Sequence, residues 1–145
     1  MNNAEPVVLI ADDGQTDQGE LRSVFQGAGF SQPLQFARGG DDAMAYLRGD
    51  GDYRNRAQFP LPCILVLDVE MLRKNGHDVL AWQEGQPGQT RLPVYLLSAA
   101  SRPEDIERAY DLGAHAYLVK PCTLDALDQM AKQLFSWLKT NRLAA

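Results

Sequence analysis

Five short apolar runs constrain the fold of this 145-residue chain more than any other feature of its sequence. Each run has four or five residues, and most of them contain no polar residue. A run in which apolar and polar residues do not alternate is typical of a strand that is buried on both faces, as in a parallel sheet. The runs are Val7–Ala11, Leu34–Ala37, Cys63–Leu67, Val94–Leu97 and Ala116–Val119.

Apolar residues at helical spacing follow each of these runs. The spacing i, i+3, i+4, i+7 is complete over Leu21–Ala28, and a longer stripe covers Leu127–Leu138. A strand followed by a helix, repeated five times, predicts an α/β fold with an open parallel sheet and helices on both faces. Ligands of such sheets bind outside the carboxyl ends of the strands, so the residues after each run are the candidate functional residues.

Length and composition predict one soluble domain. With 45% hydrophobic and 23% charged residues, the chain has the balance of a globular protein. The net charge of −5 disfavours nucleic acid or an anionic membrane as the main partner. No run approaches the roughly 20 residues of a membrane span, and the N-terminus lacks the features of a signal peptide. We expect a single cytoplasmic domain over residues 1–145, with a core from about 6 to 139, free thiols at Cys63 and Cys122, and no output domain.

Polar residues follow four of the five predicted strands. A hydroxyl or carboxylate after one strand is ordinarily a helix cap, and a lone lysine usually faces solvent. Because the carboxyl ends of parallel strands share one edge, these residues together predict a site there. They are Asp12 and Asp13, then Asp68, then Ser98, and finally Lys120 with Pro121.

The chemistry of this set is that of phosphoryl transfer. Asp13 and Asp68 offer carboxylates to Mg²⁺, and Asp12 can act directly or through water. An aspartate can also attack phosphorus and form an aspartyl phosphate. Lys120 can hold the phosphoryl oxygens as a point charge, and Ser98 can donate a hydrogen bond to one of them.

These motifs resemble the receiver domain of two-component response regulators over Val7 to about Leu138. The resemblance implies a flavodoxin-like (βα)5 fold with strand order 2-1-3-4-5. The matching motifs are the acidic pair in Ile10–Asp13, the phosphoacceptor strand Leu65–Asp68, the turn Asn75-Gly76, the hydroxyl in Leu96–Ala99, and the aromatic residue, lysine and proline of Ala114–Pro121.

The resemblance also implies roles and partners. A sensor histidine kinase would phosphorylate Asp68, with Mg²⁺ held by Asp12, Asp13, Asp68 and the backbone carbonyl of Glu70. Ser98, Tyr117 and Pro121 would form the switch, and the chain would be no enzyme beyond slow self-catalysed phosphotransfer and autodephosphorylation. The output surface would consist of the strand Ala116–Val119, the helix before it and the last helix. The signal would pass on through a homodimer, a downstream protein or onward phosphotransfer.

A narrower resemblance points to the small response regulators of cyanobacterial or bacterial phytochrome kinases. It rests on Ala43–Arg48, the long polar loop Gly49–Pro62 and the ending Phe135–Leu138. The loop exceeds the usual length of such a connection, and a functional segment and a surface insertion are both open interpretations. Phe135 and Trp137 cannot face the same core from one helix, which motivates the dimer hypothesis.

Three departures from the family pattern are visible. Leu72 stands where a proline is common, Gly14 where a polar residue is common, and Glu70 adds an acid beside the site. A phosphate-independent interaction module is the first alternative. A haloacid-dehalogenase-like phosphatase is a weaker one, because Asp68–Leu72 lacks the pattern Asp-x-Asp-x-Thr and the acidic pair comes first rather than late. A flavin binder is weaker still, since acids would repel its phosphate.

Overall fold

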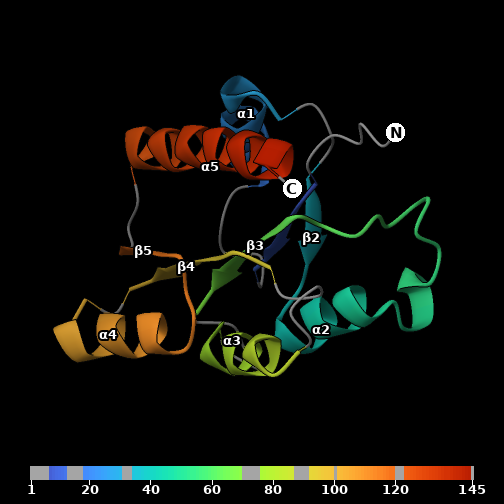
Figure 1. Ribbon diagram of the computed structural model, residues 1–145, viewed down its shortest axis with the longest axis horizontal. Coiled ribbons are helices and arrows are strands. Elements are labelled where there is room, and N and C mark those ends of the chain that lie inside the picture. The colour runs from blue at the N-terminus through green and yellow to red at the C-terminus, as the bar shows by residue number, and fades with distance from the viewer. Residues whose placement is uncertain are drawn as a thin grey trace.

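The computed structural model describes residues 7–12, 18–30, 34–69, 76–86, 92–99, 101–119 and 123–144. Strands and helices alternate along the chain, as Figure 1 shows. The strands are β1 (Val8–Ala11), β2 (Gln35–Ala37), β3 (Ile64–Asp68), β4 (Val94–Ser98) and β5 (Ala116–Val119). The helices are α1 (Gln18–Ala28), α2 (Gly40–Arg48), α3 (Gly76–Glu84), α4 (Pro103–Asp111) and α5 (Leu124–Ala144), with a short 3-10 helix η1 (Gly51–Tyr53).

The five strands form one parallel sheet in the order β2-β1-β3-β4-β5. Helices α1 and α5 cover one face, and α2, α3 and α4 cover the other (Figure 1). The α/β class, the two helical layers and the strand order are therefore as predicted. Among the described residues, no helix combines the length and hydropathy that a membrane span requires.

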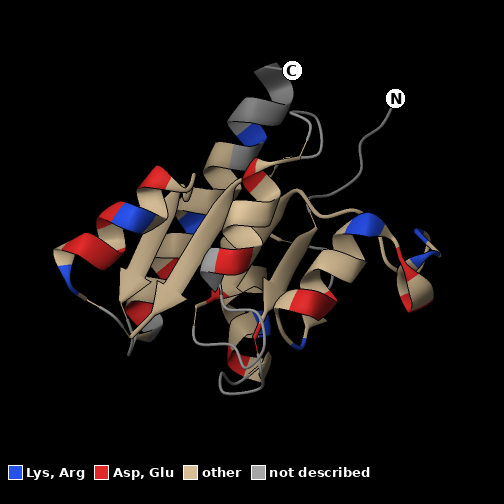
Figure 2. Ribbon diagram, turned by 90° about the horizontal axis from the view of Figure 1, so that it is seen from below, with Lys and Arg blue, Asp and Glu red and all other residues tan. Residues whose placement is uncertain are grey.

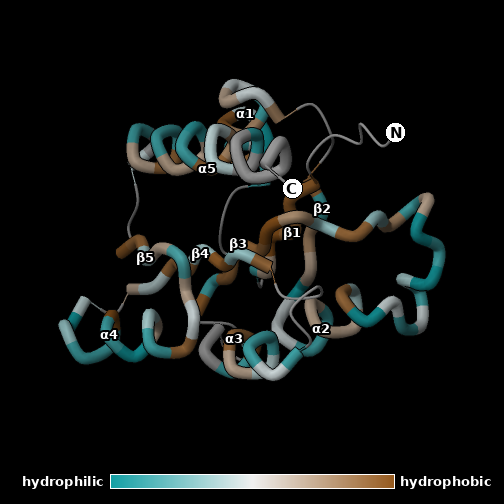
Figure 3. The backbone as a smooth tube through the Cα atoms, viewed as in Figure 1, coloured by the Kyte–Doolittle hydropathy of each residue, from teal (hydrophilic) through white to brown (hydrophobic). Residues whose placement is uncertain are grey.

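Two apolar cores lie on the two faces of the sheet. Strand alternation sends Leu9, Leu65 and Leu67 towards α2–α4 and sends Ile10 and Val66 towards α1 and α5. The strands are accordingly the most hydrophobic part of the molecule (Figure 3). Burying a side chain of this size contributes about 1.5–3 kcal/mol relative to leaving it exposed, so both layers hold the sheet firmly.

Aromatic residues join α1 to α5. The ring of Phe30 lies 5.3 Å from that of Phe25 and 5.1 Å from that of Phe135. Gly29, with φ of +120°, makes room for this contact, since a Cβ there would meet the Phe135 ring at 2.8 Å. Phe135 thus packs inward, while Trp137 stays 40% exposed, which confirms that the two side chains face apart.

Strand β5 differs from the expectation of a strand buried on both faces. Its residues Ala116, Tyr117 and Leu118 are half-buried, and Val119 is exposed. The physical reason is its position, because β5 is an edge strand of the sheet and has a strand neighbour on one side only. Cys63, similarly, is a free thiol as predicted but is half-buried, and Cys122 lies outside the described residues.

The 49–62 segment is folded against the body of the domain. Tyr46 donates a hydrogen bond from its hydroxyl to the Pro60 carbonyl at 2.8 Å. The Tyr53 hydroxyl donates to Oδ1 of Asp42 at 2.8 Å. The Arg56 guanidinium donates to the Leu47 carbonyl at 3.1 Å, and its carbon Cζ lies 5.7 Å from the centre of the Tyr46 ring.

Three rings give this segment a small core of its own. Tyr53 lies 4.8 Å from Tyr46 and 5.0 Å from Phe59, measured between ring centres. Tyr53 and Phe59 also pack against the larger core beneath α2. The segment that reads as a polar loop in sequence is therefore an ordered extension of α2.

We predict that alkaline pH loosens this extension. Burial raises the pKa of Tyr46 from 10.0 to about 12. Burial, followed by the hydrogen bond to Asp42, raises the pKa of Tyr53 from 10.0 to about 12. A raised pKa in the folded state means that this stability is complete below pH 10 and is lost as pH rises towards 12.

Urea unfolding at a series of alkaline pH values measures this loss. The double variant Tyr46→Phe/Tyr53→Phe should lose less free energy of unfolding with pH than the wild type. The variant Tyr110→Phe, at an exposed tyrosine on α4, is the matched control and should behave as the wild type. A double variant as pH-sensitive as the wild type would contradict the prediction.

Candidate functional site

The strand register places two of the predicted site residues next to each other. Ala11 pairs with Leu67, so the next residues, Asp12 and Asp68, end neighbouring strands side by side. The backbone N–H of Asp12 donates to the Ala37 carbonyl at 2.9 Å and extends the β1–β2 ladder to that residue. Parallel strands lie about 4.8 Å apart, so the two carboxylates leave the sheet as immediate neighbours.

Both carboxylates are buried. Asp12 is 6% exposed and Asp68 only 1%. All residues of the five strands are described, and Asp68 is the only Asp, Glu, Lys or Arg among them. Figure 2 shows that charged residues are concentrated on the helices and on the 49–62 segment rather than on the strands. A buried charge is costly unless it is compensated, which makes a structural role as a helix cap an insufficient account of Asp68.

Ser98 lies on β4, the strand on the other side of β3 from β1, one position beyond the residue that pairs with Asp68. It is the last residue of β4 and fully buried, and Asp68 pairs with Leu97 just before it. Leu96 pairs with Tyr117, and by strand alternation Ser98 shares their face of the sheet. The half-buried ring of Tyr117 packs against the core on this face, so hydroxyl and aromatic residue lie on one side of neighbouring strands.

One backbone contact holds the chain just after Asp68. The Val69 N–H donates to the Leu97 carbonyl at 2.8 Å, which continues the β3–β4 ladder past the end of β3. The motif analysis missed this positioning role. Val69 is apolar and buried, and an apolar residue directly after the aspartate is the signal that could have indicated it.

Four predicted site residues lie outside the described residues: Asp13, Glu70, Lys120 and Pro121. So do Gly14 and Leu72, two of the departures from the family pattern. Of the predicted set, the strand register makes Asp12 and Asp68 neighbours, while Ser98 ends the next strand, β4, and Tyr117 lies on β5.

The donor set suits a hard divalent cation. Two buried carboxylates on neighbouring strands repel each other, and a cation between them removes that repulsion. Oxygen ligands of this kind are those that Mg²⁺ and Mn²⁺ prefer. Within the described part of the chain, no three His, Cys, Asp or Glu side chains form a metal-binding group. Asp12 and Asp68 are the described pair, and both remaining acids of the predicted site, Asp13 and Glu70, lie outside it.

Comparisons with known proteins agree with this arrangement. Residues 8–132 match the family model of the response regulator receiver domain. Response regulator Rcp1 of Synechocystis sp. is 31% identical over 145 residues, which cover 99% of this chain and 97% of Rcp1.

Solved structures lead to the same family. The phosphorylated cyanobacterial phytochrome response regulator RcpA has a TM-score of 0.79 at 30% identity, over 94% of this chain and 96% of RcpA. The Mn²⁺-bound form of response regulator Rcp1 has a TM-score of 0.77 at 31% identity, over 93% of this chain and 96% of Rcp1. The chain therefore belongs to the response regulator receiver domains of two-component signalling.

Proposed function

We propose that this receiver accepts a phosphoryl group on Asp68. The observation that carries the proposal is a 1% exposed aspartate at the carboxyl end of the central strand, beside Asp12 at the end of β1 and next to the strand that ends at Ser98. A carboxylate oxygen of Asp68 attacks the phosphorus of a phosphohistidine. The P–O bond forms as the P–N bond breaks, and the imidazole nitrogen leaves with the electron pair and takes up a proton. Asp68 becomes an acyl phosphate.

Mg²⁺ would be held by Asp12, Asp13, Asp68 and the backbone carbonyl of Glu70. When bound, it supplies positive charge to the oxygens that surround the phosphorus. The chain's own residues orient the attacking carboxylate. The ladder on both sides of β3 fixes the direction of the Asp68 carboxylate, so little orientational freedom remains to be lost at the moment of attack.

Lys120 and Ser98 would then hold the phosphoryl oxygens, the lysine as a charge and the serine as a hydrogen-bond donor. A movement of Ser98 towards the phosphoryl group would change the packing around Tyr117, because both residues lie on the same face of neighbouring strands. Pro121 follows the lysine in the sequence and would restrict the backbone at that position. We infer that Ser98, Tyr117 and Pro121 bias an equilibrium between two conformations of the α4–β5–α5 face.

A sensor histidine kinase is the proposed phosphodonor, and the relatives named as phytochrome response regulators support a bacteriophytochrome. Such kinases draw phosphate from ATP, so we place the reaction in the cytoplasm. Neither nucleic acid nor a membrane is part of the proposal, in keeping with the net charge of −5.

The α4–β5–α5 face supports a homodimer as one output. Three of its large apolar side chains are exposed, and each comes from a different element: Tyr110, Val119 and Trp137. A contiguous group of exposed apolar residues is typical of an interaction surface, and we propose that these three residues at the β5 edge of the domain form one. A downstream protein or a phosphotransfer partner would use the same face.

The proposed phosphoacceptor role of Asp68 predicts that a small phosphodonor labels the chain. Incubation with acetyl phosphate and Mg²⁺ should add one phosphoryl group to the wild type, and intact mass spectrometry measures it. Asp68→Asn should gain none, because the amide lacks the nucleophilic oxygen. Asp78→Asn, at an aspartate of α3, is the matched control and should be labelled. Equal labelling of wild type and Asp68→Asn would remove Asp68 from the role, and steady turnover of simple phosphomonoesters would favour a phosphatase.

The second prediction concerns the cation. Mg²⁺ at 100 times its dissociation constant should raise the free energy of unfolding by about 2.7 kcal/mol. Differential scanning calorimetry at constant ionic strength should show a higher Tm in the wild type and a smaller rise in Asp13→Asn/Asp68→Asn. Glu104→Gln, at an exposed acid of α4, should keep the full rise. A wild-type Tm that does not change with Mg²⁺ would contradict the cation site.

The third prediction concerns self-association. In equilibrium sedimentation with beryllofluoride and Mg²⁺, the wild type should contain a dimer. The variant Tyr110→Ser/Trp137→Ser should be monomeric, because it removes apolar contact area from the proposed face. Leu61→Ser changes an exposed apolar residue elsewhere and should leave the dimer intact. A wild-type monomer with and without beryllofluoride would overturn the dimer.

A further inference from the structure

The side chain of Asp42 joins two separate segments of the chain. Asp42 lies in the first turn of α2 and is half-buried. Its Oδ2 accepts a hydrogen bond from the Arg38 backbone N–H at 2.9 Å, and its Oδ1 accepts one from the Tyr53 hydroxyl at 2.8 Å. One carboxylate therefore holds both the turn that links β2 to α2 and the 49–62 extension.

The peptide group between Ala37 and Arg38 carries this link to the proposed cation site. Its N–H donates to Asp42, and its carbonyl, which belongs to Ala37, accepts the backbone N–H of Asp12 at 2.9 Å. Because a peptide group is planar, the bond on its N–H side fixes the direction of the carbonyl that holds Asp12. Hydrogen bonds on the two sides of one peptide group also polarise and strengthen each other.

The start of α2 depends on Asp42 for a side-chain hydrogen bond. The N-cap is Gly39, whose carbonyl accepts the Ala43 N–H at 2.9 Å but which has no side chain to cap the helix. In a capping box, an acid at the third helical position reaches back to the backbone before the helix. Asp42 stands at this position and reaches back to Arg38, so the geometry of the β2–α2 turn follows the direction of its carboxylate.

The extension presents the Tyr53 hydroxyl from a packed ring. The ring centre of Tyr53 lies 4.8 Å from that of Tyr46 and 5.0 Å from that of Phe59. A ring held on two sides has little rotamer freedom left to lose when its hydroxyl binds a partner. Burial raises the pKa of Tyr53 to about 12, so the hydroxyl is protonated and donates to Asp42 at neutral pH.

We propose that Asp42 and Tyr53 are positioning residues for Asp12 and, through it, for the cation of the phosphoryl site. Without the Tyr53 hydroxyl, the Asp42 carboxylate can turn, and the 37–38 peptide group loses its fixed direction. The Asp12 carboxylate then spends less time in the orientation that binds Mg²⁺. This inference rests on the proposed function, because that function assigns Asp12 to the cation.

Isothermal titration calorimetry with Mg²⁺ tests the inference without any phosphorylation. Tyr53→Phe removes one hydroxyl and should raise the dissociation constant of Mg²⁺ about fivefold, which corresponds to one hydrogen bond of ordinary net strength. The matched control is Tyr46→Phe. It removes a hydroxyl from the same ring cluster, but that hydroxyl donates to the Pro60 carbonyl and has no link to the β2–α2 turn. Tyr46→Phe should bind Mg²⁺ as the wild type does.

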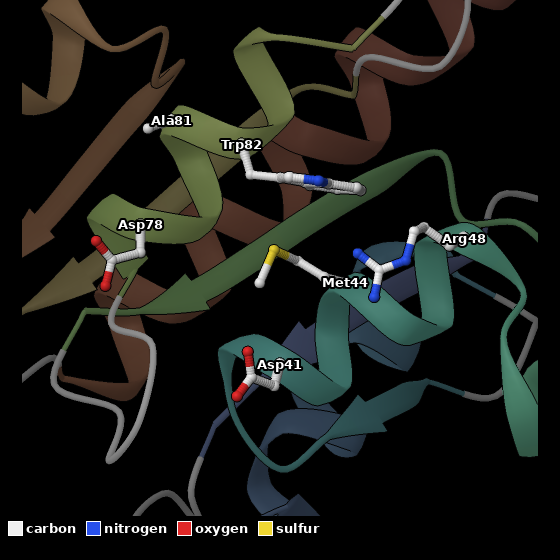
Figure 4. Close-up of a pocket in the computed structure, with 6 residues that line it drawn as sticks. All are labelled: Asp41, Met44, Arg48, Asp78, Ala81 and Trp82. Atoms are coloured by element: carbon white, nitrogen blue, oxygen red, sulfur yellow. The ribbon is translucent and has the colours of Figure 1, made fainter.

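A second matched pair separates the hydrogen bonds from the charge. Asp42→Asn keeps the shape of the side chain but replaces one accepting oxygen by a donor, so it should also weaken Mg²⁺ binding. Asp41 is the neighbouring acid in the same helical turn. It lines the groove between α2 and α3, where Figure 4 shows it with Arg48 at the other end of the helix. Asp41→Asn removes the same charge and should bind Mg²⁺ as the wild type does.

Nuclear magnetic resonance reports on the geometry itself. In ¹⁵N-labelled protein without Mg²⁺, the backbone N–H signals of Asp12 and Arg38 should shift in Tyr53→Phe and should stay in place in Tyr46→Phe. The double variant Tyr53→Phe/Asp42→Asn should bind Mg²⁺ no more weakly than Asp42→Asn alone, because both substitutions interrupt the same series of hydrogen bonds.

The outcomes separate this inference from the proposed function. A wild type that binds Mg²⁺, with unchanged affinity in Tyr53→Phe and Asp42→Asn, would overturn the inference and leave the phosphoacceptor role of Asp68 standing. Equal weakening by Tyr53→Phe and Tyr46→Phe would also overturn it, because a general loosening of the extension would then be the cause. Equal weakening by Asp41→Asn and Asp42→Asn would reduce the effect to charge and overturn it as well. A wild type that binds no Mg²⁺ would overturn the cation site and the inference together.

Discussion

The burial of Asp12 and Asp68 side by side is the constraint on which the rest of the structure depends. Two carboxylates on neighbouring strands are unfavourable in an apolar sheet, and nothing in the packing of the two cores requires them. The register Ala11–Leu67 makes them neighbours, and the ladder beyond each strand end holds them there. The domain therefore holds two buried carboxylates next to each other, an arrangement that suits a divalent cation, at the sheet edge where α/β proteins bind ligands.

The two faces of the sheet differ in the elements that cover them. The α1–α5 face is closed by the ring contacts of Phe30 with Phe25 and Phe135, and it serves stability. The α2–α4 face carries the 49–62 extension and, at its edge, Tyr117. The sheet and its two cores thus form a well-packed body that holds the buried carboxylates of Asp12 and Asp68 at one edge.

Sequence patterns predicted the fold well because the burial of apolar side chains is what chiefly stabilises it. Runs with few or no polar residues are typical of strands buried on both faces of a sheet, so all five strands and the α/β layers followed from them. The exposure of Val119 did not follow, since a local pattern does not say which strand is at the edge. The order of the strand ends predicted that Asp12, Asp68 and Ser98 follow adjacent strands, and the register makes Asp12 and Asp68 direct neighbours. The compact 49–62 extension was not predictable, because its contacts are specific hydrogen bonds such as Tyr46 to Pro60 rather than a periodic pattern.

The central claim is that Asp68, among all the carboxylates of the chain, receives the phosphoryl group, and mapping the acyl phosphate tests it most directly. The protein is labelled with acetyl phosphate and Mg²⁺, reduced with borohydride to convert the acyl phosphate into homoserine, then digested and sequenced by mass spectrometry. Our account predicts homoserine at position 68 and aspartate at positions 12 and 13. Homoserine at another position, with Asp68 unmodified in labelled protein, would contradict it.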